Sequence, residues 1–158
     1  MSRAIFLDFD GVLHDVDAGS IEYENGSMVI TGTRLFQHVG VLEQLILPFP
    51  DVQLVIHSSW RNHYTLHELY ARFPASLRNR IRGMTQPGTL RYAGILDYAE
   101  EHGISDYLIL DDAPGEFCYS SDLPDELVIC HELLGIGSPV VQEQIQNWLD
   151  GAGRAKEG

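Results

Sequence analysis

The sequence has few of the residues that mark several large classes of protein. Only 2 of its 158 residues are cysteines, too few for a disulfide framework, and this scarcity favours a reducing compartment. Its 10 lysines and arginines stand against 23 aspartates and glutamates, and the net charge of −13 argues against binding along an extended nucleic-acid duplex. No apolar run approaches the roughly 20 residues of a membrane span, and no charged-apolar-small leader opens the chain. We therefore expect a cytoplasmic protein with no membrane partner.

The remaining composition is that of an ordinary globular protein. Hydrophobic residues make up 44% of the chain and charged residues 21%, and 158 residues suffice for one domain with its own core. We expect a single domain over residues 1–151. Residues 152–158 are small and polar and are expected to form a flexible tail.

Short apolar runs alternate with helical patterns along the chain. Strands are expected over residues 4–7, 51–56, 106–110 and 126–130, and helices over about 34–47, 64–73, 89–102 and 139–149. Asn25-Gly26 lies in the middle of residues 21–30 and predicts a hairpin there. No strand is assigned to residues 75–87. Strands separated by helices imply right-handed crossovers and a mostly parallel α/β sheet.

Two aspartates, Asp8 and Asp10, follow the first apolar run, and Gly11 comes directly after them. A buried strand that ends in two carboxylates is costly unless their desolvation is compensated, and a divalent cation is the usual compensation. In open α/β sheets, ligands bind beyond the carboxyl ends of the strands, where this run ends. The same letters also occur in turns and in calcium loops, so the motif alone does not fix the chemistry.

Two other strands also end in polar residues. The second strand runs into Ser58 and Ser59, and the third into Asp111 and Asp112. Because adjacent parallel strands bring their carboxyl ends side by side, we expect these groups to share one crevice. Phosphoryl transfer to a carboxylate needs such a set, since Mg²⁺ offsets the repulsion between carboxylate and phosphate, and a hydroxyl and a fixed cation hold the phosphoryl oxygens.

Asp8-Phe9-Asp10-Gly11 resembles the first motif of the haloacid dehalogenase (HAD) superfamily, Asp-x-Asp-Gly followed by a hydrophobic residue. The resemblance implies a Rossmann-like three-layer α/β fold, here with a minimal hairpin cap. It also implies that Asp8 is a nucleophile that takes a phosphoryl group and that Asp10 is the general acid/base.

The second and third HAD motifs bring in a hydroxyl and a cation. Ser58 falls where the second motif places its serine or threonine, and Ser59 is the competing choice. The third motif is normally a lysine, but the single lysine of this chain is Lys156, in the tail. We therefore assign this role to Arg91, whose guanidinium is a planar fork and not a point donor.

Asp111 and Asp112 resemble the acidic pair of the fourth motif. The resemblance implies that Mg²⁺ is bound by Asp8, the backbone carbonyl of Asp10 and Asp111, with Asp112 as a second ligand or as an orienting group. Substrate contacts are assigned to four further residues near the motifs: Gly11, His14, Ser59 and Arg61.

A longer string of residues is similar to one branch of the superfamily, the HAD domain of Swiss Army Knife RNA-repair proteins and small standalone relatives. It comprises Leu7 to His14, Ser58-Ser59-Trp60-Arg61, Arg91, Leu110-Asp111-Asp112 and Phe117. The similarity covers roughly residues 3 to 149, and it departs at Gly94, where a glutamate is expected. It implies a phosphatase that acts on a phosphorylated small molecule, a nucleotide or a nucleic-acid end.

Other interpretations of these residues remain open. The chain could be a catalytically silent module that holds metal and phosphate, or an RNA-repair factor whose protein partner supplies a basic surface. Ser58 could cap the following helix, Arg61 could pair with a carboxylate, and His14 could be a hydrogen-bonded loop histidine. Three histidines spaced along the same region could form a zinc site: His57, His63 and His67.

Overall fold

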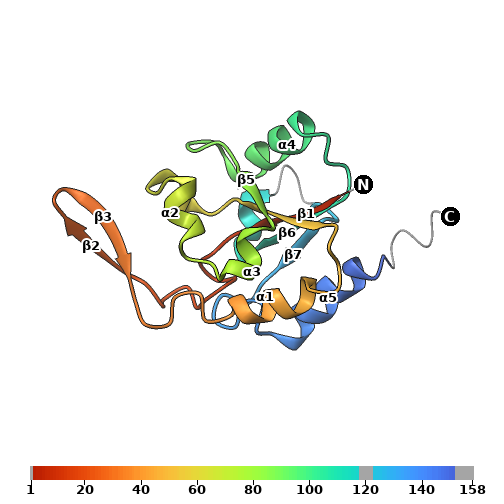
Figure 1. The fold of residues 1–158 in the computed structure, drawn as a ribbon, viewed down its shortest axis with the longest axis horizontal. Helices are drawn as coiled ribbons and strands as arrows, with labels where there is room; N and C mark the ends of the chain where they lie inside the picture. The colour runs from red at the N-terminus through yellow and green to blue at the C-terminus, as the bar shows by residue number, and fades with distance from the viewer. Residues whose placement is uncertain (1, 118–122, 152–158) are drawn as a thin grey trace.

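A computed structural model of the chain describes residues 2–117 and 123–151 (Figure 1). Cys118 and the expected tail at residues 152–158 lie outside the described residues. Five strands form a parallel sheet, and β1 (Arg3–Leu7) is its central strand. The strand order is β5 (Ile81–Met84), β4 (Val52–Ile56), β1, β6 (Tyr107–Asp111) and β7 (Leu127–Ile129). The predicted α/β fold with a mostly parallel sheet is therefore confirmed.

Helices cover both faces of the sheet, so the molecule has three layers (Figure 1). On one face, α4 (Arg91–Glu101) packs Ile95 and Tyr98 against Phe6 of β1. On the other face, α1 (Val39–Ile46) and α5 (Pro139–Leu149) pack against Ile5 and Leu7. Because both faces of β1 are buried, its residues from Ala4 to Leu7 are apolar without alternation. No helix in the described ranges is long and apolar enough to cross a membrane.

Four shorter helical segments complete the described part of the domain. They are η1 (Ser59–Asn62), α2 (Leu66–Tyr70), α3 (Ala75–Arg78) and η2 (Pro114–Phe117). Helix α2 begins at a capping box, in which the Thr65 side chain accepts from the Glu68 N–H and the Glu68 side chain accepts from the Thr65 N–H. Of the helix expected over residues 64–73, only α2, Leu66–Tyr70, is an α-helix.

The predicted hairpin is present as β2 (Ser20–Glu24) and β3 (Ser27–Thr31), which projects away from the sheet (Figure 1). Asn25 (φ 51°) and Gly26 (φ 82°) form its turn, as expected for an Asn-Gly hairpin. At its base the backbone N–H of Ile30 donates to the Tyr64 hydroxyl, at 2.9 Å. This hydrogen bond joins the hairpin to the segment that follows β4.

The structure corrects two sequence-based expectations. The helix expected over residues 34–47 begins only at Val39, because Phe36 adopts a left-handed conformation (φ 60°) that an α-helix does not contain. Residues 75–87, to which no strand was assigned, contain the edge strand β5. Its four residues, Ile81-Arg82-Gly83-Met84, are too few and too mixed to show a strand period.

Candidate active site

The register of the sheet brings the candidate residues together at one edge. Leu7 of β1 is paired with Ile56 of β4 on one side and with Leu110 of β6 on the other. The residues that follow Leu7, Ile56 and Leu110 (Asp8, His57 and Asp111) are therefore neighbours at the carboxyl ends of the strands. The side chains expected to share one site therefore begin at this end of the sheet.

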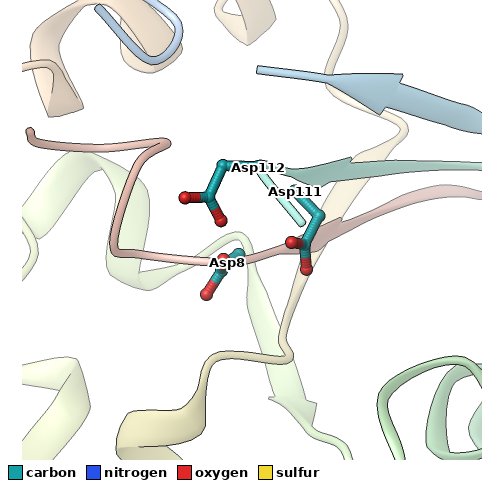
Figure 2. Close-up of side chains that lie close together, drawn as sticks. All are labelled: Asp8, Asp111 and Asp112. Carbon is teal, nitrogen blue, oxygen red and sulfur yellow. The ribbon is translucent and has the colours of Figure 1, made fainter. Parts of the chain in front are cut away.

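Asp8, Asp111 and Asp112 form a carboxylate cluster at this edge, shown in Figure 2. One carboxylate oxygen from each of the three lies within 4.8 Å of the others. Asp8 and Asp111 are buried, and Asp112 is half-buried. The side chain of Asp10 is not part of this cluster, and the expectation that its backbone carbonyl binds a metal stays a prediction.

Arg91, the first residue of α4, reaches the carboxylate cluster from the helix N-terminus. Its Nη1 lies 2.8 and 2.9 Å from the two carboxylate oxygens of Asp111 and 3.3 Å from Oδ2 of Asp8. The arginine assigned to the third motif is thus in the site, while its role toward a substrate stays a prediction.

The carboxylate cluster is short of positive charge. Burial, and next the negative charge of Asp111, raise the pKa of Asp8 well above its usual range. The pKa of Asp112 is also raised, by burial and then by Asp111. Burial acts in the same direction on Asp111, but hydrogen bonding to His57 and the charge of Arg91 outweigh it, and the pKa of Asp111 is lowered.

These features test whether the residues suit a divalent cation. The donors are carboxylate oxygens, the ligands that hard cations such as Mg²⁺ prefer. In the described part of the chain, the guanidinium of Arg91 is the cation bonded to the cluster, against three carboxylates. The cluster therefore fits an oxygen-preferring divalent metal, and its excess negative charge is what such a metal would offset.

Asp10 lies beside the cluster and is held through both of its carboxylate oxygens. Oδ1 is 2.8 Å from Nε2 of His14, and Oδ2 accepts a hydrogen bond from the Trp60 indole Nε1–H at 3.1 Å. The other ring nitrogen of His14, Nδ1, accepts the backbone N–H of Phe36 at 3.1 Å. A neutral His14 therefore carries its proton on Nε2 and donates it to Asp10.

His57 is a functional candidate whose contact the sequence did not predict. It follows β4 directly, is fully buried, and places Nε2 3.0 Å from Oδ2 of Asp111. Burial lowers its pKa, so the neutral ring donates from Nε2, and Nδ1 has no hydrogen-bond partner among the residues that the structure describes. The sequence signal that could have indicated a site role for His57 is its position directly after the strand that ends at Ile56.

The zinc alternative assigned His57 to a different cluster. Among the described residues, the group that brings metal-binding side chains together is that of Asp8, Asp111 and Asp112. The histidines at 57, 63 and 67 do not converge in the same way, and His63 and His67 are exposed.

In the segment Ser58-Ser59-Trp60-Arg61, all residues but Ser59 are buried beside the site. Ser58 is buried, and its hydroxyl accepts the N–H of Trp60 at 3.2 Å, so it caps η1 as considered above; Ser59 is exposed. Which of the two hydroxyls meets a substrate stays a prediction.

Arg61 is buried and donates to backbone carbonyls. Its Nη1 lies 3.1 Å from the carbonyl oxygen of His57 and 2.8 Å from that of Ser58, and Nη2 lies 3.1 Å from that of Thr89. These contacts fasten the loop after β4 to the segment that leads into α4. The substrate contact expected of Arg61 stays a prediction, beside this observed structural role.

Gly11 gives the chain room next to Asp112. Its φ is 74°, and a Cβ built on it would lie 2.2 Å from Oδ2 of Asp112. Glycine is therefore required for the position of the Asp112 carboxylate, whatever contact Gly11 makes with a substrate.

Comparison with protein-family models gives a match over residues 4–141. The matching family is described as the HAD domain in Swiss Army Knife RNA repair proteins. Searches of curated proteins and of solved structures found no match.

Proposed function

Because the chain belongs to the family of HAD domains found in Swiss Army Knife RNA repair proteins, and thus to the HAD-type hydrolases, we propose that it is a Mg²⁺-dependent phosphatase. It hydrolyses phosphomonoesters through an aspartyl-phosphate intermediate. The observation that carries the proposal is the carboxylate cluster, which joins Asp8 to Asp111 and Asp112 beside the Arg91 guanidinium.

In the first step a carboxylate oxygen of Asp8 attacks phosphorus, and the bond from phosphorus to the leaving oxygen breaks. Asp10 gives its proton to that oxygen. In the second step water attacks the phosphorus of the aspartyl phosphate, Asp10 takes a proton from the water, and the Asp8 carboxylate and inorganic phosphate are released. At the end of the second step, Asp8 is again a free carboxylate and Asp10 again carries a proton.

Asp8 and Asp111, with the backbone carbonyl of Asp10, would hold Mg²⁺, and Asp112 would bind or orient it. When bound, the metal supplies a positive charge that reduces the repulsion between the nucleophilic carboxylate and the phosphate. Arg91 and Ser58 hold the phosphoryl oxygens as charge redistributes among them.

The proposed substrates are nucleotides and nucleic-acid ends, as the name of the family suggests. The hairpin of residues 20–31 projects from the sheet and is no larger than ten strand residues and a turn, so it leaves room for a large substrate. The net charge of −13 disfavours a long RNA duplex, and a protein partner with a basic surface would assist binding of an RNA end.

The test is phosphate release from a panel of small phosphoesters, nucleotides, and oligonucleotides phosphorylated at the 3′ or the 5′ end. Each is incubated with Mg²⁺ and with EDTA, beside the Asp8→Asn protein. Release that needs the metal and is lost in the variant supports the proposal. Metal binding without release from any member of the panel would overturn it in favour of a binding module.

A further inference from the structure

We propose that Trp60 and His14 are positioning residues that fix the Asp10 carboxyl group for proton transfer to the leaving oxygen. This inference rests on the proposed phosphatase function and deepens it, since it names what orients the acid/base. Each residue is hydrogen-bonded to one carboxylate oxygen of Asp10, and the two come from different segments. His14 lies in the loop after β1, and Trp60 lies in η1.

The direction of the Trp60 N–H is set by packing. The ring is 1% exposed and meets Phe9, Phe36 and Tyr64 at centroid distances of 5.5, 5.5 and 5.7 Å. A ring enclosed in this way cannot turn without displacing its aromatic neighbours. Its single polar atom, Nε1, therefore points steadily at Oδ2 of Asp10.

The direction of the His14 N–H is set by a backbone hydrogen bond. His14 is fully buried, and its Nδ1 accepts from Phe36, whose left-handed conformation (φ 60°) is uncommon for a non-glycine residue. That contact makes Nε2 the donor, and Nε2 faces Oδ1 of Asp10. The unfavourable backbone conformation of Phe36 is therefore part of the same arrangement that defines the His14 tautomer.

The two donors leave Asp10 able to react. A carboxyl oxygen has two acceptor positions, so a single N–H on each oxygen leaves a second position on each. The Asp10 side chain is 38% exposed, so part of it is open to a substrate. The carboxyl group is then fixed in rotation while one oxygen can carry the proton that the leaving oxygen receives.

The chain holds a matched control in its second tryptophan. Trp148 donates its indole Nε1–H to Oδ1 of Asp106 at 3.1 Å, the same distance as between Trp60 and Asp10. Asp106 directly precedes β6 and therefore lies at the opposite edge of the sheet from the carboxylate cluster. Trp148→Phe removes an equivalent hydrogen bond without touching the site.

The main experiment compares kcat/KM for p-nitrophenyl phosphate and for an alkyl phosphate, in the wild type and in the Trp60→Phe and Trp148→Phe proteins. A nitrophenolate leaves without a proton, whereas an alkoxide needs one from Asp10. We expect Trp60→Phe to lose about tenfold or more on the alkyl ester and about twofold or less on the aryl ester. Trp148→Phe should change both rates equally.

A second pair of variants tests His14. His14→Gln keeps an N–H donor near Oδ1 of Asp10, and His14→Leu does not. We expect the glutamine variant to retain more of the alkyl-ester rate, relative to the aryl-ester rate, than the leucine variant. Equal ratios in the two would overturn the positioning role of His14.

A spectroscopic measurement on metal-free protein needs no turnover. The indole N–H resonance of Trp60 should shift in the Asp10→Asn protein, and that of Trp148 should not. An unmoved Trp60 resonance, or a Trp60→Phe protein that loses both esters equally, would overturn the inference while wild-type phosphatase activity stands. A wild type inactive on both esters and on every member of the phosphate-release panel would instead overturn the proposed function, and the positioning role with it.

Discussion

His57 and Asp111 form a hydrogen bond of 3.0 Å in which neither side chain is exposed to solvent. Burial lowers the pKa of His57, and the neutral ring donates to a carboxylate whose pKa is itself lowered by that bond and by Arg91. Second partners of this kind orient carboxylates that bind metals. The pair also links the stability of the metal-free protein to pH.

Replacing His57 with glutamine should flatten this dependence of stability on pH. Because the pKa of His57 is lowered on folding from 6.5, the unfolded chain gains its proton first as the pH falls, and the folded state loses stability from about 6.5 downward. Glutamine can donate to Asp111 but does not titrate. Urea unfolding in EDTA at about pH 8 and about pH 5 should show a smaller loss for His57→Gln than for the wild type.

The exposed His63 provides the control for that experiment, as His63→Gln removes a histidine outside the site. An equal loss of stability in the wild type and in His57→Gln would show that His57 does not titrate on unfolding.

Asp8→Asn should abolish turnover and yet stabilise the metal-free protein. The raised pKa of Asp8 reports that burial and the nearby Asp111 disfavour its ionised form, and asparagine removes that charge. A gain of about 1 kcal/mol corresponds to a melting temperature about 2–4 °C higher. Thermal unfolding in EDTA measures the gain, and addition of Mg²⁺ should stabilise the variant less than the wild type; a lower melting temperature in EDTA would contradict the account.

Arg91→Ala should strengthen the response to Mg²⁺ while it weakens the metal-free protein. The guanidinium neutralises Asp8 and Asp111, so its loss removes the cation paired with these two buried carboxylates, at a cost of about 3 kcal/mol. A divalent cation then restores more stability than in the wild type. Melting temperatures with and without Mg²⁺ test this, with Arg82→Ala as the control because Arg82 bonds to Gln53 outside the cluster. A Mg²⁺ response below that of the wild type would refute it.

Part of this site could be predicted from the sequence, because short local patterns determine it. Apolar runs that stop at Asp8 and at Asp111 mark strands of a parallel sheet, and such strands necessarily bring their ends together. The hairpin was equally local, since Asn25-Gly26 favours its turn by conformation alone. These features need no knowledge of distant contacts.

The remaining features depend on contacts between residues far apart in the chain. Trp60 and Asp10 are separated by 50 positions in the sequence, and His57 and Asp111 by 54. The local sequence around these residues therefore does not predict either hydrogen bond. The late start of α1 has a similar origin, because the N–H of Phe36 is bonded to His14. Sequence patterns indicate which residues are polar at strand ends, and the fold determines which of them meet.

Gly11→Ala should impair metal binding more than Gly26→Ala does. Both glycines have positive φ, 74° and 82°, so each substitution carries a backbone cost of about 1 kcal/mol. A Cβ at Gly26 meets nothing within 4 Å, whereas one at Gly11 would collide with Asp112. Calorimetric titration with Mg²⁺ should show weaker binding for Gly11→Ala alone, and equal affinities would remove Asp112 from the metal site.

Cys130 should resist thiol reagents in the folded protein. It is 3% exposed, and burial raises the pKa of its thiol, so both access and ionisation are disfavoured. In a Cys118→Ser background, reaction with a disulfide reagent at about pH 8 should be roughly a hundredfold slower than in urea. Rapid labelling of the native protein would show that this part of the sheet opens readily.

The central position of β1 sets when the site can exist during synthesis. β1 is made first, but its two neighbours in the sheet are β4 and β6, and β6 carries Asp111 at its end. Most of the domain must therefore be synthesised before Asp111 and Asp112 can lie beside Asp8. A nascent or truncated chain that ends before β6 contains Asp8 without the rest of the carboxylate cluster, so the proposed phosphatase activity is excluded until the fold is nearly complete.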